Sequence, residues 1–139
     1  MKISIVVPCS LRHLRHLKNI IRGNISLQTK KPDEVVVVIN PVMNSDQYKL
    51  LNDILDKVKK YYNCVKLIAV KEECTPGKAR NIGFHHSSGD IIIFTDADDL
   101  YHPMRNEIIT RIFKDHECDA VIHDGYHRDK RFLTEKKID

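Results

Sequence analysis

Several features that would assign the chain to a class of protein at once are missing from its 139 residues. No apolar run approaches the roughly 20 residues that a membrane-spanning helix requires. The N-terminus passes from Met1 and Lys2 directly into a strand-like segment, without the cleavage pattern of a signal peptide. There is no internal repeat and no low-complexity linker. These absences predict one cytoplasmic domain, 1–139, that is large enough to bury a hydrophobic core.

Cysteine and histidine show no metal-binding or disulfide pattern. The four cysteines are widely spaced and include no CxxC pair, so neither a disulfide framework nor a zinc cluster is expected. The eight histidines lack the HExxH and HxH spacings. We therefore expect reduced structural thiols and histidines that lie mostly on the surface.

The chain is mildly basic, with a net charge of +4 and a pI near 8.9. Such a surplus favours anionic ligands, although many ordinary domains share it. After the first predicted strand, basic residues line one side of a helical segment. We interpret this basic stripe as a solvated helix face. Because no aromatic residues are interleaved with them, we expect no nucleic-acid partner. This basic stripe consists of Arg12, His13, Arg15, His16, Lys18 and Arg22.

Short apolar runs rich in β-branched residues alternate with amphipathic segments along the chain. The last segment, 126–139, is highly charged and is predicted to lie on the surface or to be partly disordered. The predicted strands are Lys2–Val7, Val35–Ile39, Val65–Val70, Ile91–Phe94 and Ala120–Ile122.

Each gap between strands carries a helical signal. Ser10, a common helix-capping residue, begins a helical pattern that extends to Ile25. Asn44 begins a capping box, and further helices are expected from Lys78 and from Pro103. Helices between consecutive strands imply parallel pairing with right-handed crossovers. The sequence therefore predicts an α/β fold, a three-layer α/β/α sandwich with a mainly parallel sheet.

The strand Ile91–Phe94 ends in an acidic turn that contains Asp96, Asp98 and Asp99. Three carboxylates this close repel one another and are costly to desolvate. At the carboxyl edge of an open α/β sheet, where ligands bind, hard oxygen atoms suit Mg²⁺ or Mn²⁺. A solvated acidic turn is the alternative for an isolated DxD pattern, but the buried strand before it favours a site.

The loop that leads into the third helix complements this turn. Gly77–Asn81 places two cations at a helix start, where free backbone N–H groups attract anions. Basic residues there oppose the helix dipole, which makes an ordinary helix start a poorer explanation. Lys78 and Arg80 can meet phosphate oxygens, and a divalent ion on Asp98 would help them to neutralise a diphosphate.

Taken together, these segments resemble the nucleotide-binding half of family 2 glycosyltransferases of the GT-A fold. The matching segments are SIVVPCS, SLQTKKPDEVVVV, GKARNIGFHHSSGDIIIFTDADDLYHP and DAVIHDGY, in the family's order and over nearly the whole length. The central one is specific, because a GxARN-type helix runs into SxGDxxxFxDADDxxxP at the expected separation. The resemblance implies a metal-dependent, inverting enzyme that transfers a sugar from a nucleoside-diphosphate sugar to an acceptor hydroxyl.

The resemblance also implies roles for individual residues. Asp98 would ligate Mn²⁺ or Mg²⁺ on the donor diphosphate, with Asp96 and Asp99 as further candidate ligands. Asp96 would contact the ribose and Arg80 the nucleotide. The predicted donor-binding residues, which include the loop cations Lys78 and Arg80, are Pro8, Ser10, Asn40, Lys78, Arg80 and Asp96.

Two departures from the family pattern leave questions open. Family members usually carry an acidic residue after the second strand that contacts base or ribose, whereas this chain has Asn40, so the base is not assigned. Inverting members use a catalytic carboxylate well downstream of the acidic turn, but this sequence ends about forty residues past Asp98. Asp124 is a candidate base that does not match the family motif. The catalytic base, the sugar, the acceptor and the oligomeric state therefore stay unassigned.

Three other functions share single features with this sequence. A nucleotide-sugar-binding module without catalysis, or a donor-binding half that needs a further domain or partner, is the main alternative. A phosphatase of the haloacid dehalogenase type would need further Ser or Thr, Lys and acidic residues downstream of DADDL, and too little chain remains. A P-loop NTPase is excluded, because Pro76-Gly77-Lys78 lacks the first glycine and the following Ser or Thr.

Overall fold

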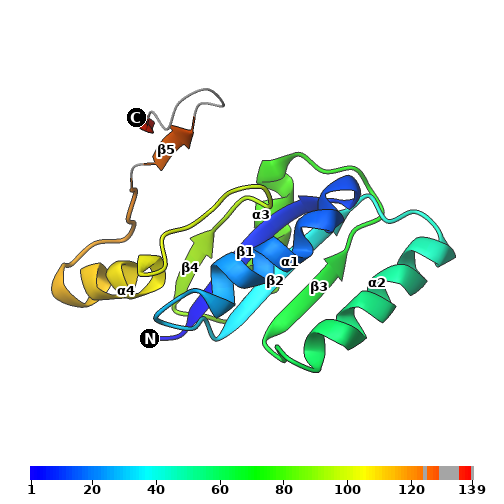
Figure 1. Ribbon diagram of the computed structural model, residues 1–139, viewed down its shortest axis with the longest axis horizontal. Coiled ribbons are helices and arrows are strands. Elements are labelled where there is room, and N and C mark those ends of the chain that lie inside the picture. The colour runs from blue at the N-terminus through cyan, green and yellow to red at the C-terminus, as the bar shows by residue number, and fades with distance from the viewer. Residues whose placement is uncertain (124, 129–134, 139) are drawn as a thin grey trace.

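The computed structural model describes residues 1–123, 125–128 and 135–138, and its centre is a four-stranded sheet (Figure 1). The strand order is β3-β2-β1-β4, and each neighbouring pair in this sheet is parallel. The four strands predicted from β-branched runs before the acidic turn are therefore confirmed. They are β1 (Ile3–Ser10), β2 (Glu34–Asn40), β3 (Val65–Ala69) and β4 (Ile91–Phe94).

Among the described residues, four α-helices accompany the sheet. The Asn44 side chain accepts from the Gln47 N–H at 2.9 Å, which confirms the predicted cap of the second helix. The third helix begins earlier than the predicted Lys78, because Thr75 caps it. No helix in the described part of the chain is long and apolar enough to cross a membrane. The helices are α1 (Leu17–Ile21), α2 (Ser45–Lys59), α3 (Pro76–His85) and α4 (Arg105–Asp115).

The helices cover both faces of the sheet, which makes the three layers (Figure 1). Because successive side chains of a strand point to opposite faces of the sheet, β1 contributes residues to two hydrophobic cores. Ile5 and Val7 join the core that includes residues of α1, α2 and α4. Val6 faces the other way and packs with Val38 and with Ala79 of α3. The predicted α/β sandwich with a mainly parallel sheet is therefore confirmed.

The first helical segment differs from the single α-helix expected after Ser10. It begins as a 3₁₀-helix, η1 (Leu11–His16), continues as α1 and ends as a π-helical turn, η2 (Arg22–Ser26). Asn24 in η2 is buried, and its side chain donates to the carbonyl of Ile20 at 2.9 Å. A side chain that bonds to the preceding turn competes with regular helix geometry. The Ser10 side chain makes no capping hydrogen bond to this segment.

The predicted fifth strand, Ala120–Ile122, is wrong. These residues form no strand, and Ile122 is 96% exposed. An apolar run of three residues offers too little surface to hold a strand against the sheet. Instead, β5 (Gly125–Arg128) and β6 (Glu135–Ile138) form a separate antiparallel pair, which begins one residue before the segment 126–139 predicted to be a charged tail.

Candidate functional site

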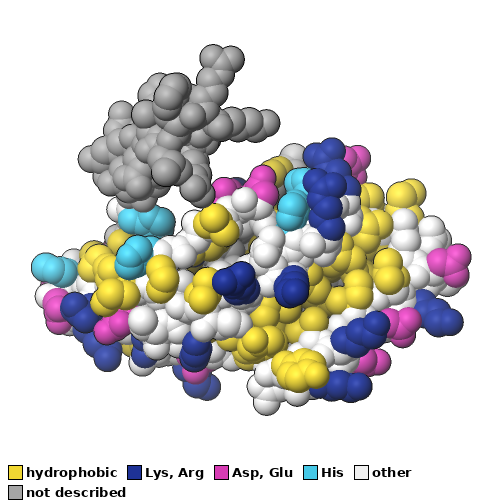
Figure 2. Space-filling view, viewed as in Figure 1, with side chains coloured by type: hydrophobic (Ala, Val, Ile, Leu, Met, Phe, Trp, Pro, Cys, Tyr) yellow, Lys and Arg dark blue, Asp and Glu magenta, His cyan; other side chains and the backbone are white. Residues whose placement is uncertain are grey.

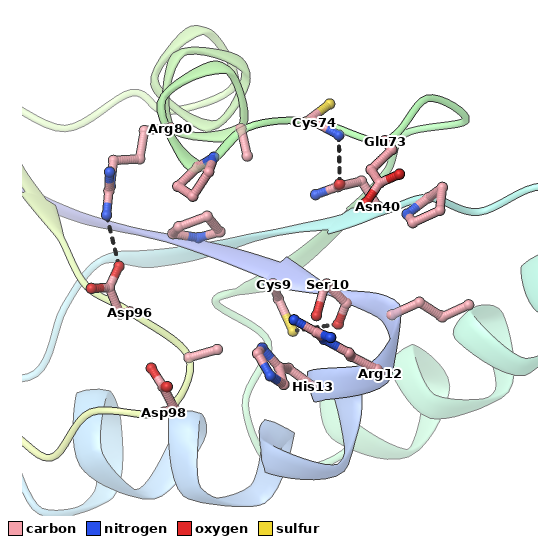
Figure 3. A pocket seen from close by; sticks show the side chains of 16 residues that line it. Cys9, Ser10, Arg12, His13, Asn40, Glu73, Cys74, Arg80, Asp96 and Asp98 are labelled. Atoms are coloured by element: carbon pink, nitrogen blue, oxygen red, sulfur yellow. Dashed lines mark hydrogen bonds and ion pairs between the residues drawn. The ribbon is translucent and has the colours of Figure 1, made fainter.

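A cavity of about 540 Å³ lies at the carboxyl ends of β1 and β2 and beside the turn after β4 (Figure 3). Open parallel sheets bind ligands at this edge, and the volume lies in the usual range for small-molecule sites. In the space-filling view, basic, histidine and acidic side chains gather over the end of β1 (Figure 2). The lining residues are Pro8, Cys9, Ser10, Leu11, Arg12, His13, Asn40, Pro41, Glu73, Cys74, Pro76, Ala79, Arg80, Asp96, Ala97 and Asp98.

An ion pair joins α3 to the acidic turn at the cavity wall. Arg80 extends from α3, and its Nη2 donates to Asp96 Oδ1 at 2.8 Å (Figure 3). The side chains are 36% and 47% exposed, so the pair adds little to folding stability. Both groups therefore remain within reach of a ligand in the cavity.

Asp98 is exposed on the same wall and lies apart from the Arg80–Asp96 pair in Figure 3. Within the described ranges, no three His, Cys, Asp or Glu side chains are grouped so that they could hold a metal ion. Mg²⁺, however, is usually bound by one or two carboxylates and completes its coordination with substrate phosphates and water. The carboxylates of Asp98 and Asp96 fit that role, whereas a cage made by the protein alone does not.

The shape of the acidic turn depends on Tyr101. Its hydroxyl accepts from the Asp96 N–H at 2.6 Å and donates to the Asp96 carbonyl at 3.2 Å. Burial raises the pKa of Tyr101 to about 12, which favours the protonated phenol still further. The Arg105 guanidinium lies 4.2 Å from the centre of this ring and donates to the Phe94 carbonyl at 3.0 Å. Tyr101 and Arg105 thus fix the backbone from which Asp96 and Asp98 project.

We expect Tyr101→Phe to lower the free energy of unfolding by about 1–2 kcal/mol, because the Asp96 N–H and carbonyl both lose their partner. Urea denaturation at neutral pH measures this loss. Tyr61→Phe is the matched control, since Tyr61 is 82% exposed and should show no change. Equal stability of the two variants would contradict the role assigned to the Tyr101 hydroxyl.

The structure brings five of the six predicted donor-binding residues to one cavity, namely Pro8, Ser10, Asn40, Arg80 and Asp96. The predicted metal ligand Asp98 lines the same cavity. Lys78 is not among the lining residues, because its ammonium pairs with Glu72 at 3.0 Å on the surface. Asp99 does not line the cavity either and interacts electrostatically with Tyr101 and Arg105. Asp124 lies outside the described residues.

Some lining residues were not predicted from the sequence. Arg12 and His13 belong to the basic stripe assigned to a solvated helix face, yet both line the cavity, because η1 begins directly at the strand end. Nearby, the Ser10 hydroxyl is buried and has no hydrogen-bond partner among the described residues. Cys9 and Cys74 also line the cavity, and the four cysteines are free thiols in the structure.

The fold and the cavity define a class of protein, an α/β sandwich with a polar ligand site at the carboxyl edge of its parallel sheet. Comparison with known proteins narrows this class. The model of the family named Glycosyl transferase family 2 matches residues 4–138, and the chain belongs to that family. The resemblance stated from the sequence is thereby confirmed.

Individual relatives agree with this assignment. The chain is 26% identical to an uncharacterized glycosyltransferase of Nostoc sp. over 142 residues, which cover all of this chain and 40% of that protein. It is 28% identical to an uncharacterized glycosyltransferase of Rickettsia conorii over 127 residues, which cover 91% of this chain and 19% of that protein. The chain thus spans at most about two fifths of the length of these relatives.

Solved structures share the fold. S. aureus TarS 1–349 superposes with a TM-score of 0.66 at 22% identity, over 84% of this chain and 33% of that one. TarS 1–349 is also known in complex with UDP-GlcNAc. The mannosyltransferase PcManGT of Pyrobaculum calidifontis, in complex with GDP-Man and Mn²⁺, superposes with a TM-score of 0.55 at 23% identity. The match covers 77% of this chain and 30% of PcManGT. The shared fold is the GT-A sandwich of glycosyltransferases.

Proposed function

We propose that this chain binds a nucleoside-diphosphate sugar and serves the transfer of that sugar to an acceptor hydroxyl, with Mn²⁺ or Mg²⁺ as cofactor. The observation that carries the proposal is the grouping of Arg80, Asp96 and Asp98 on one wall of the cavity. A guanidinium and two carboxylates beside a helix N-terminus match a diphosphate with its counter-ion. The ligands of TarS and PcManGT, UDP-GlcNAc and GDP-Man, belong to the same chemical class.

Each group has a role in this proposal. Asp98 holds the divalent ion, with Asp96 as a further ligand or as an acceptor for the ribose. Arg80 donates to phosphate oxygens in place of its present partner Asp96. Arg12 and His13 add cationic or hydrogen-bonding groups at the end of β1. The bound ion would contribute neutralisation of the diphosphate as it leaves.

The chemistry is a displacement at the anomeric carbon. The acceptor oxygen forms a bond to that carbon on the face opposite the diphosphate, while the bond from carbon to phosphate oxygen breaks and its electron pair stays with the leaving group. The configuration inverts, and the acceptor proton passes to a base. Arg80 and the helix N-terminus stabilise the charge that develops on the diphosphate. We assign no residue of the described part of the chain as the base.

Calorimetric titration of UDP, GDP, CDP and dTDP, with Mn²⁺ and then with EDTA, tests this proposal. We expect one diphosphate to bind in Mn²⁺, and Asp98→Ala to weaken that binding at least about tenfold and to remove its metal dependence. Asp53→Ala is the control, since Asp53 is exposed on α2, which contributes no residue to the cavity. Failure of the wild type to bind any of the four would sink the proposal.

A second candidate function is donor binding without catalysis by this chain alone. It is favoured because the cavity carries groups for a diphosphate and its ion, whereas no residue of the described part of the chain is assigned as the base. Release of free UDP or GDP from the matching sugar donor separates the two candidates. Turnover that Asp98→Ala abolishes supports the transferase, whereas binding without turnover supports the module.

A further inference from the structure

The side of the cavity opposite the Arg80–Asp96 pair has polar groups of its own (Figure 3). Asn40 Oδ1, at the end of β2, accepts a hydrogen bond from the Cys74 backbone N–H at 2.8 Å. This bond ties the loop before α3 to the end of the sheet. Glu73, the residue just before Cys74, is thereby held beside Asn40, and both side chains line the cavity.

These two side chains have complementary hydrogen-bonding capacities. The carbonyl oxygen of Asn40 already accepts from Cys74, so its amide nitrogen is the group that can donate to a ligand. The Glu73 carboxylate only accepts, and a carboxylate binds most strongly when two neighbouring donors reach its two oxygens. A nucleoside diphosphate offers such a pair at the 2′ and 3′ hydroxyls of ribose, and guanine offers another at N1–H and N2–H₂.

We propose that Glu73 is a specificity-determining residue that accepts hydrogen bonds from a pair of neighbouring donors on the nucleoside. The inference rests on the proposed function of the cavity and extends it, because it assigns the nucleoside to the Asn40–Glu73 side and the diphosphate to the Arg80 side. A pair of donors on the ligand would stabilise a carboxylate in this place, whereas the negative phosphates of the ligand repel it.

Because of that repulsion, the direction in which the ligand affinity changes decides the test. A carboxylate that merely stands near an anionic ligand weakens binding, so its neutralisation should leave affinity unchanged or raise it. Glu72→Gln is the matched control, because Glu72 precedes Glu73, pairs with Lys78 and does not line the cavity. We expect Glu73→Gln to lower affinity about tenfold, and Glu72→Gln to leave it unchanged or slightly higher.

The experiment is calorimetric titration of the wild type and both variants with UDP, GDP, 2′-deoxy-UDP and 2′-deoxy-GDP in Mn²⁺, after thermal melting has shown that each variant is folded. If the donors are ribose hydroxyls, the wild type binds the deoxy ligands less tightly and Glu73→Gln no longer discriminates. If they belong to guanine, Glu73→Gln weakens only the guanine ligands.

Two negative outcomes are distinct. A wild type that binds a diphosphate, together with a Glu73→Gln variant that binds it as tightly, overturns the assignment of Glu73 and leaves the function of the cavity standing. A wild type that binds none of the ligands overturns the proposed function and the Glu73 inference with it.

Discussion

The substitution Gly83→Ala is expected to lower the free energy of unfolding by about 2 kcal/mol. Gly83 lies in α3, and a methyl group there would overlap Cγ1 of Val6 and lie 3.1 Å from Cγ2 of Val38. Both valines are fully buried, and their strands, β1 and β2, are paired with each other inside the sheet, so neither side chain can move away at low cost. The helix-propensity gain of alanine, about 1 kcal/mol, offsets only part of this overlap.

Urea denaturation of Gly83→Ala and Gly77→Ala measures this effect against a matched control. Gly77 lies in the same helix, and apart from its chain neighbours and the backbone of that helix, a Cβ there would meet no atom of the described residues within 4 Å. We expect Gly77→Ala to be as stable as the wild type or slightly more stable. Two variants of equal stability would show that α3 does not pack on the sheet as closely as the structure has it.

The same contact also serves the site. Arg80 extends from α3, one turn before Gly83, and reaches Asp96 in the turn after β4. A helix pushed outward by a methyl group would move Arg80 away from that turn. The close packing of Gly83 on Val6 and Val38 therefore sets the distance between the groups proposed to bind the diphosphate.

The strands and the acidic turn were predictable because their signals are local. Val35–Ile39 is a run of β-branched residues, and all five are fully buried in the central region of the sheet. Pairing in parallel then places the ends of β1 and β2 beside the turn after β4. Asn40, Asp96 and Asp98 reach one cavity as a consequence of that topology.

Other parts of the site depend on contacts that the sequence does not reveal. Arg12 and Arg15 belong to the same basic stripe, but only a 3₁₀ turn directly after β1 brings Arg12 to the cavity. Glu73 reaches it because Asn40 bonds to the backbone of the next residue, a contact between positions 34 residues apart. Ala120–Ile122 failed as a strand because a local apolar run does not specify a neighbour to pair with.

At the opposite end of the sheet, the substitution Glu34→Gln is expected to destabilise the protein by about 3 kcal/mol at pH 7. The Glu34 side chain is 7% exposed and accepts hydrogen bonds from Ser4 Oγ at 2.5 Å, from Lys66 Nζ at 2.7 Å and from the Ser88 N–H. These donors lie on β1, on β3 and in the loop before β4. One carboxylate thus joins the amino ends of three strands and a loop.

The charge of Glu34 is what the network stabilises. Burial alone would raise its pKa, but the hydrogen bonds from Lys66, Ser4 and Ser88 outweigh burial and lower the pKa from an ordinary 4.5 to about 2. A depressed pKa means that the folded state prefers the ionised carboxylate. The resulting stability is fully present above pH 4.5, and it is lost as the pH falls from there through about 2.

Urea denaturation of wild type and Glu34→Gln at several pH values between 7 and 3 tests this reasoning. The difference in free energy of unfolding should be constant from pH 7 to pH 6 and should lose about half of its size by pH 3, because the unfolded wild type then takes up a proton. Glu117→Gln, at an exposed position after α4, is the control and should match the wild type throughout. A difference that stays constant down to pH 3 would mean that the amide loses shape or hydrogen bonds rather than charge, and the ionic account of this network would be wrong.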